Sequence, residues 1–169
     1  IPALMSGRVD VAVASTSDAS VVVSGTVSTA GAMSLTARTG GTVTASAAGL
    51  LGLSASNTFT DNAVVRISNS AGIDVGSLTL LAETKTSYTA TSRSALNSVS
   101  GQTQAYIEGS TVNTRGAGGL TISANDDASL SARSPDIATD LSGSLPVSIA
   151  ASVARNELDR DVEAYIDSS

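Results

Sequence analysis

Apolar and polar residues alternate along much of the chain. Near the middle of the sequence, Val65 and Ile67 fall on one side of an extended backbone and Arg66 falls on the other. Successive side chains of a strand point to opposite faces, so this alternation is typical of β-strands with one buried face. The same alternation returns at residues 104–108 and 163–167. The chain is therefore predicted to be all-β.

A Gly-led segment occurs three times. Residues 76–90 align without gaps with residues 31–45, which begin 45 positions earlier, and with residues 118–132, which begin 42 positions later. In each copy the third, fifth and seventh residues are apolar and are expected to face inward: Met33, Leu35 and Ala37; Leu78, Leu80 and Ala82; Leu120, Ile122 and Ala124. This internal repeat indicates an architecture of stacked, equivalent units.

A second segment recurs between the Gly-led copies, at residues 64–70, 104–110 and 163–169, and each copy follows an asparagine. These asparagines, Asn57, Asn97 and Asn156, are 40 and 59 residues apart. We interpret residues 1–169 as a single β-solenoid segment of a longer repeat protein. Its predicted units are 20–63, 64–103 and 104–162, the last with an inserted coil near 133–155.

Apolar residues also recur about every 20 positions, at Val23, Val43, Ile67, Tyr88, Ile107 and Leu130. That step predicts a right-handed parallel β-helix with coils of about 20 residues, two coils to each repeat. Stacking equivalent strands about 4.8 Å apart would bury each apolar column as a ladder. The glycines between the repeated segments suit tight corners. A β-sandwich fits less well, because the hairpin dipeptides Asn-Gly and Asp-Gly are both absent.

Composition narrows the possible functions. The net charge of -6 disfavours nucleic acid as a partner, because phosphate binding needs a basic face. No apolar run is long enough for a membrane-spanning helix. With no Cys and no His, disulfides, thiolate metal sites and a Ser-His-Asp triad are excluded. Only 2% of the residues are aromatic, as a narrow solenoid interior requires. No cofactor or metal is expected.

The repeated Ala-Tyr-Ile segment at Ala105–Ile107 and Ala164–Ile166, followed by a Gly-led Leu-Thr-Ile segment, resembles repeats of giant bacterial exoproteins. Those are the filamentous-haemagglutinin-like and adhesin-like surface proteins, and the resemblance covers residues 20–169. It implies a right-handed parallel β-helix in a protein that is secreted to the extracellular space or cell surface. It also implies a role in cell adhesion, biofilm or extracellular matrix rather than catalysis.

An outward column of three side chains is the main candidate ligand site. Arg66, Tyr106 and Tyr165 occupy equivalent positions and could contact a polysaccharide, a host or cell surface, or a partner chain. Ordinary stacking of side chains between coils explains the same pattern. Asp126 and Asp127 are interpreted as solvated charges at a corner, and they point to no calcium site.

The two ends of the chain are candidates for contacts with adjacent repeats or copies of the protein. If Ser169 were followed by Ile1, Val9 would lie 12 residues after Ile166, close to the spacing found inside the chain, and residues 7–13 would imitate residues 118–124. We therefore expect end-to-end stacking, by self-assembly into a fibre or within a longer chain. The interface residues predicted for this stacking are Val9, Val11, Val13, Ala164 and Ile166.

Two other functions remain open. A carbohydrate-active parallel β-helix enzyme of the polysaccharide lyase type should show clustered acidic, basic and aromatic residues in a groove, whereas this chain has 3 Tyr, 1 Phe and no Trp. An ice- or surface-binding module should show Thr-x-Thr pairs in one register, whereas the pairs beginning at Thr42 and Thr84 differ in register.

Overall fold

The fold was analysed in a computed structural model that describes residues 9–47, 53–69, 72–134 and 152–167. In these ranges the chain forms strands and no helix, so nothing in the described part could cross a membrane as a helix. Seven strands are long: β1 (Val9–Val23), β3 (Ala32–Ser46), β4 (Leu53–Ser68), β6 (Ser77–Thr91), β7 (Ser94–Glu108), β9 (Leu120–Arg133) and β10 (Val153–Asp167). Three are short: β2 (Val27–Ser28), β5 (Gly72–Val75) and β8 (Thr111–Thr114).

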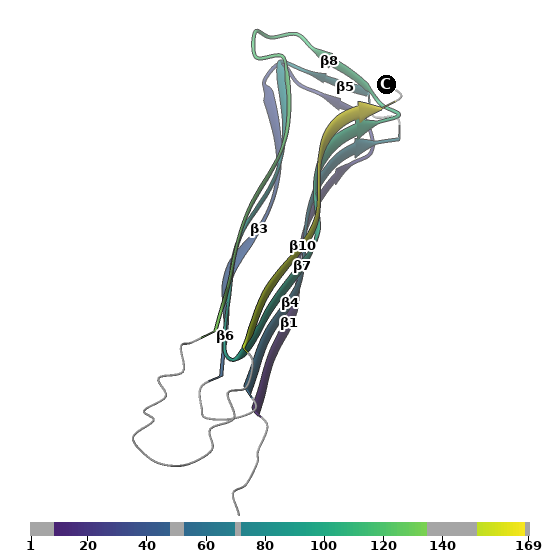
Figure 1. The fold of residues 1–169 in the computed structure, drawn as a ribbon. Coiled ribbons are helices and arrows are strands. Elements are labelled where there is room, and N and C mark those ends of the chain that lie inside the picture. Colours follow the sequence, from purple (N-terminus) through teal and green to yellow (C-terminus); the bar gives the residue numbers. More distant parts are fainter. Residues whose placement is uncertain (1–8, 48–52, 70–71, 135–151, 168–169) are drawn as a thin grey trace, which may run out of the picture.

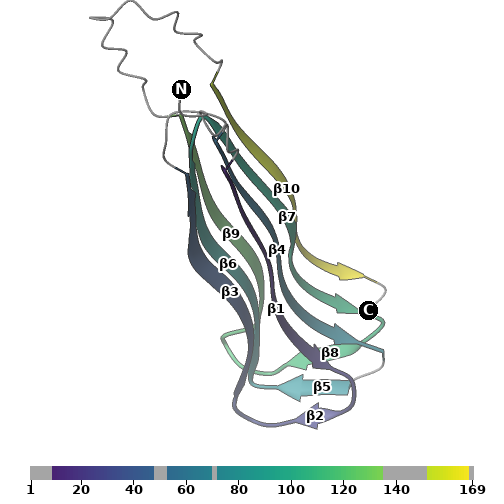
Figure 2. The same ribbon diagram turned by 90° about the horizontal axis from the view of Figure 1, so that it is seen from below.

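These strands form three sheets, and within each sheet all strands are parallel. Sheet A has the order β1-β4-β7-β10, sheet B the order β2-β5-β8, and sheet C the order β3-β6-β9. The chain contributes one strand to each of the three sheets in turn and then returns to sheet A. Each such passage is one coil, and the coils stack as in a parallel β-solenoid. Figures 1 and 2 show the long sheets A and C facing each other, with the short sheet B closing the gap between them at one end of the strands.

One full turn of the chain takes 39 to 46 residues in its regular part. Val9 pairs with Leu53, Val27 pairs with Ile73, and Ser54 pairs with Ser94. The predicted coil of about 20 residues is therefore wrong, because each sequence repeat makes one coil and not two. Apolar residues 20 positions apart, such as Val23 and Val43, lie in opposite sheets of the same coil. Both sheets turn apolar side chains inward, which gives the half-repeat the appearance of a whole turn.

The pairing register is the one that the sequence repeats predict. Leu78 pairs with Met33 and Leu120, at the offsets of 45 and 42 found in the Gly-led segments. Val64, the first residue of one predicted unit, pairs with Ser20 and Gln104, and Gln104 pairs with Glu163.

The core is a set of stacked aliphatic columns between sheets A, B and C. Val65, Ile67, Ala105 and Ile107 are each at most 1% exposed, as their predicted inward positions require. Leu78, Leu80 and Ala82 of β6 face them across the interior in the same cluster. Burial of these ladders is the main source of stability, because each fully buried Leu or Ile side chain contributes about 1.5–3 kcal/mol.

The longest interruption of the repeat lies between β9 and β10. Residues 135–151, the larger part of the predicted inserted coil, are outside the described residues. Val153 of β10 nevertheless pairs directly with Ser94 of β7. The additional residues therefore place no strand between β7 and β10 in sheet A.

Candidate functional site

The end of the stack formed by β9 and β10 is uncovered. Sheet A has four strands, whereas sheets B and C have three, so β10 packs against β9 across the interior, but no further strand of sheet C in the described chain covers its other side. Leu158 is 55% exposed, although its register partner Val99 is 1% exposed. Ile166 is likewise 53% exposed beside the buried Ile107. Residues with core positions are thus left open to solvent at this end.

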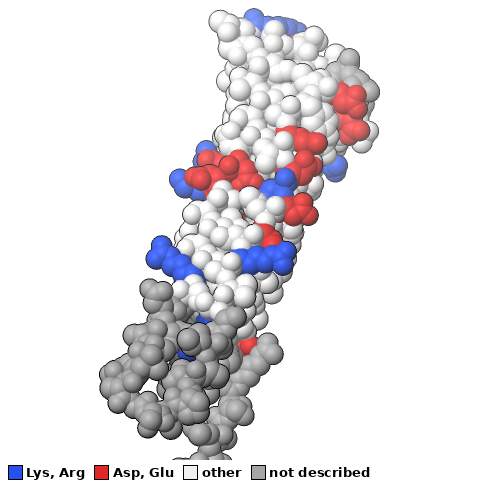
Figure 3. Space-filling model, viewed as in Figure 1, with Lys and Arg blue, Asp and Glu red and all other residues white. Residues whose placement is uncertain are grey.

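The last strand of sheet C is also more exposed than the strand beside it. Leu120 of β9 is 37% exposed, although it pairs with the fully buried Leu78. Figure 3, which has β9 and β10 toward the viewer, shows wide uncharged surface between bands of acidic and basic side chains. An exposed strip of aliphatic side chains above a regular core is what a further coil would cover. We call this strip the open end; its members are Leu120, Leu158, Val162 and Ile166.

A buried asparagine ladder runs through sheet A to the open end. The side-chain amide of Asn57 donates to Oδ1 of Asn97 at 2.9 Å, and Asn97 donates to Oδ1 of Asn156 at 2.9 Å. Asn57 and Asn97 are fully buried, whereas Asn156 is exposed. Each rung satisfies polar groups of the next, so the ladder favours the one register in which the asparagines coincide.

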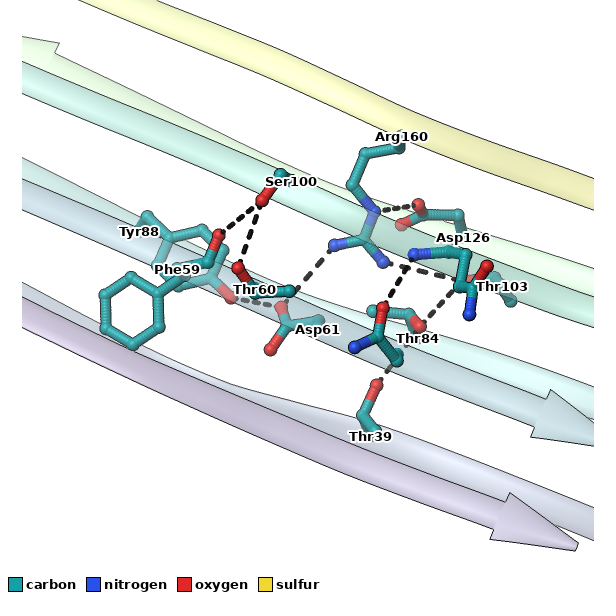
Figure 4. Close-up of polar contacts among 12 residues, drawn as sticks. Thr39, Phe59, Thr60, Asp61, Thr84, Tyr88, Ser100, Thr103, Asp126 and Arg160 are labelled. Atoms are coloured by element: carbon teal, nitrogen blue, oxygen red, sulfur yellow. Dashed lines mark hydrogen bonds and ion pairs between the residues drawn. The ribbon is translucent and has the colours of Figure 1, made fainter.

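A charged cluster, not foreseen from the sequence, crosses the interior halfway along the strands (Figure 4). The guanidinium of Arg160 in β10 is 3% exposed. Its Nε lies 2.7 Å from Oδ2 of Asp126 in β9, and its Nη1 lies 3.5 Å from Oδ2 of Asp61 in β4. The hydroxyl of Tyr88 in β6 donates to Oδ2 of the same Asp61. Arg160 thus ties the last strand of sheet A to sheet C and to a strand two coils away.

A glycine makes the long reach of Arg160 possible. Asp61, Gly101 and Arg160 are consecutive members of one column in sheet A. Gly101 has a φ of 135°, and a Cβ there would lie 2.0 Å from the carbonyl oxygen of Asp61. A side chain at residue 101 would therefore clash with the backbone of β4 and fill the space between Arg160 and Asp61. Gly101 lies within β7, not at a corner as predicted.

Burial sets the protonation of two members of the cluster. The pKa of Tyr88 is raised to about 12, first by burial and then by its hydrogen bond to Asp61, so the phenol stays protonated as a donor. Burial also raises the pKa of the Asp126 carboxyl above its ordinary value, although Arg160 opposes the shift. The prediction that Asp126 is a solvated corner charge is wrong, because its side chain is 11% exposed and lies within β9. Its neighbour Asp127 is exposed and lies 3.9 Å from Nζ of Lys85.

The predicted outward column does come together on sheet A. Arg66 pairs with Tyr106, and Tyr106 pairs with Tyr165. The two phenol rings are stacked, with centroids 4.9 Å apart and planes 2° apart. Tyr165 is 38% exposed, and its pKa is raised, first by partial desolvation and then by Tyr106 and Glu163. The column thus ends at the open end in one accessible aromatic ring surrounded by carboxylates.

The residues predicted to form an end-to-end interface lie in the first and last strands of sheet A. Ala164 and Ile166 are exposed on β10, whereas Val11 and Val13 are half-buried on β1. Val9 pairs with Leu53 at the start of β1. The predicted match between residues 7–13 and 118–124 is wrong for its described part, because residues 9–13 belong to sheet A and Leu120 begins a strand of sheet C. Joining Ser169 to Ile1 would therefore leave sheets B and C one strand short.

Neither comparison with known proteins nor a search for groups of acidic side chains that could bind a metal assigns a catalytic function. In the described ranges, no three acidic side chains converge as a metal site. Comparison with family models, with curated proteins and with solved structures finds no match to this chain. Its function is therefore inferred from the geometry and from the repeats of the sequence.

Proposed function

We propose that this chain is a structural, non-catalytic segment of a larger β-solenoid protein, in which the open end is covered by the next repeat. The exposure of Leu158, Val162 and Ile166 carries this proposal, because their register partners are buried. We also take the solenoid to be right-handed, since parallel crossovers have that hand in about 98% of cases. An extended array of such coils suits a spacer or fibre.

An adjacent repeat covers the open end better than a second copy stacked on β10. The first strand of a copy, β1, belongs to sheet A, so direct stacking would leave no strand beside β8 and β9. A following repeat supplies strands of the sheet B and sheet C types first, and these would face β10. Stacking of copies into a fibre would use the same open end but would cover it less completely.

The surroundings that we propose are the cell surface or the extracellular matrix, as in the adhesin-like proteins that the repeats resemble. The stacked Tyr106 and Tyr165 supply a flat aromatic surface of the kind that contacts sugar rings. Glu163 and Glu108 lie close enough to raise the pKa of Tyr165, and carboxylates there disfavour an anionic polymer. A neutral polysaccharide is therefore the adhesive partner that we propose.

Self-association of the isolated chain tests the open end. An uncovered aliphatic strip should make the protein associate as its concentration rises, and Val162→Asp should weaken that association at least about tenfold, because a buried, unpaired carboxylate is costly. Sedimentation velocity over a concentration series measures this.

Val22→Asp is the matched control. Val22 is 45% exposed and Val162 is 46% exposed, but Val22 lies on the outer face of sheet A in the column of Arg66. The control should associate like the wild type. A wild-type chain that stays monomeric throughout the series, or equal effects of the two substitutions, would contradict the claim that the open end is an associating surface.

A further inference from the structure

The opposite end of the stack contains a cavity lined by both polar and apolar residues. It has a volume of about 290 Å³ and lies between β1 and β3, the first strands of sheets A and C. Ser15 and Ser17 line it on β1, and Gly41 and Val43 line it on β3. The side chains of the second coil that line it are Phe59, Asp61, Thr86 and Tyr88.

Two features of the second coil show that this cavity is equipped for a ligand. Phe59 and Tyr88 form an aromatic pair, with ring centroids 4.7 Å apart, next to the carboxylate of Asp61. The hydroxyl of Thr86 is buried, with the residue only 5% exposed; it interacts with the Tyr88 hydroxyl but forms no hydrogen bond of good geometry. A buried hydroxyl without such a bond costs about 1–3 kcal/mol, and a ligand in the cavity can supply the missing partner.

The charge around the cavity selects the ligand. Asp61 belongs to a cluster of two carboxylates, Asp61 and Asp126, and a single guanidinium, Arg160. Two carboxylates thus share one guanidinium, and the described lining contains no Lys or Arg, so the surroundings of the cavity disfavour an anion. A cation gains the attraction of Asp61 and of the aromatic residues that line the cavity, and the serine and threonine hydroxyls can accept its N–H groups.

The chain itself shows how such a cation is held. From the other side of the stack, the guanidinium of Arg160 reaches Asp61 past Gly101, which has no side chain. On the cavity side the small residue Ser17 occupies the same column next to Asp61. A guanidinium that approaches past Ser17 would meet the same carboxylate from the opposite direction.

We propose that this cavity binds a guanidinium group, either on a small free molecule or as an arginine side chain of a strand stacked against β1. The proposal does not depend on the open end, because the cavity is built from β1, β3, β4 and β6. Failure of the association test would therefore leave it standing.

A titration of the protein with propylguanidinium, monitored by the chemical shifts of its amide groups in NMR spectra, tests the site. Saturable shifts are expected around Phe59, Thr86 and Tyr88, and propylurea, the neutral analogue, should bind at least about tenfold more weakly. A strand peptide containing arginine, compared with the same peptide containing citrulline, distinguishes the source. Tighter binding of the arginine peptide than of propylguanidinium assigns the site to a polypeptide, and the reverse assigns it to a free ligand.

Two substitutions and a matched control keep the test decisive. Gly41→Val should abolish binding by filling the cavity, because a Cβ at residue 41 meets no atom within 4 Å and the backbone can accept it. Gly31→Val is the matched control outside the cavity, where a Cβ meets only Oγ1 of Thr29 at 3.7 Å. Thr86→Val, which keeps the shape, should weaken binding several-fold. Equal shifts with propylguanidinium and propylurea, or wild-type binding by Gly41→Val, would overturn the proposal.

Discussion

At the scale of single residues, Arg160 is far more buried than the cations of the other described ion pairs. Its side chain is 3% exposed, whereas that of Arg155 in the same strand is 68% exposed and forms an ion pair with Glu157. Charged groups are rarely buried unless they are paired, and Arg160 has partners in β4 and β9. The cluster therefore connects the last strand to the rest of the fold.

Arg160→Met should destabilise the protein by about 3–5 kcal/mol, because it leaves two buried carboxylates without their countercharge. Arg155→Met, in the same strand, removes an exposed ion pair and should cost at most about 1 kcal/mol. Urea unfolding at neutral pH measures both values. Similar losses for the two variants would show that the buried cluster makes no special contribution.

The raised pKa of Asp126 makes part of the stability depend on pH. A carboxyl with a higher pKa in the folded state binds its proton more tightly there, so its contribution is complete below the unfolded-state pKa and is lost as pH rises through the folded-state pKa. The wild type should therefore gain free energy of unfolding relative to Asp126→Asn as the pH falls from about 7 to about 4. Urea unfolding at several pH values measures the difference, and a difference that is flat or that grows with pH would contradict the assignment.

At the scale of elements, the strands and their register could be predicted, but the length of a coil could not. Equivalent residues such as Leu78 and Leu120 align in the sequence because each must fill the same column. The repeat cannot show whether Val23 and Val43 are stacked or face each other, because both arrangements require an apolar residue. The partnership of Arg160 and Asp61 was also hidden, since it joins residues 99 apart and depends on the missing side chain of Gly101.

Engineered cysteines distinguish the two coil lengths. Neighbouring parallel strands are about 4.8 Å apart, which permits a disulfide, and the chain has no cysteine of its own. Val22→Cys with Arg66→Cys joins register partners on an exposed face and should oxidise readily. Val22→Cys with Thr42→Cys, 20 residues apart, places the thiols in sheets A and C. Non-reducing electrophoresis and mass spectrometry of the monomer detect the bond, and rapid closure of the second pair would support the shorter coil.

At the scale of the whole molecule, the inner coils repeat the same packing, whereas the two end strands of each sheet lack a neighbour on one side. The interior carries asparagine and aliphatic ladders from coil to coil, whereas β10 turns Leu158 and Ile166 to solvent. A solenoid gains stability from each added neighbour, so a coil without one is the least stable part. The open end is therefore where we expect the chain to continue.

Completing the last coil by design tests this account most directly. A second copy of residues 109–133, placed after Asp167, supplies the strand types of β8 and β9 that β10 lacks. Hydrogen exchange should then show slower exchange throughout β10 and strong protection in the added strands, with a higher midpoint of thermal unfolding. An added segment that exchanges like an unfolded peptide, and a β10 that exchanges as before, would contradict the claim that the open end is built to carry another repeat.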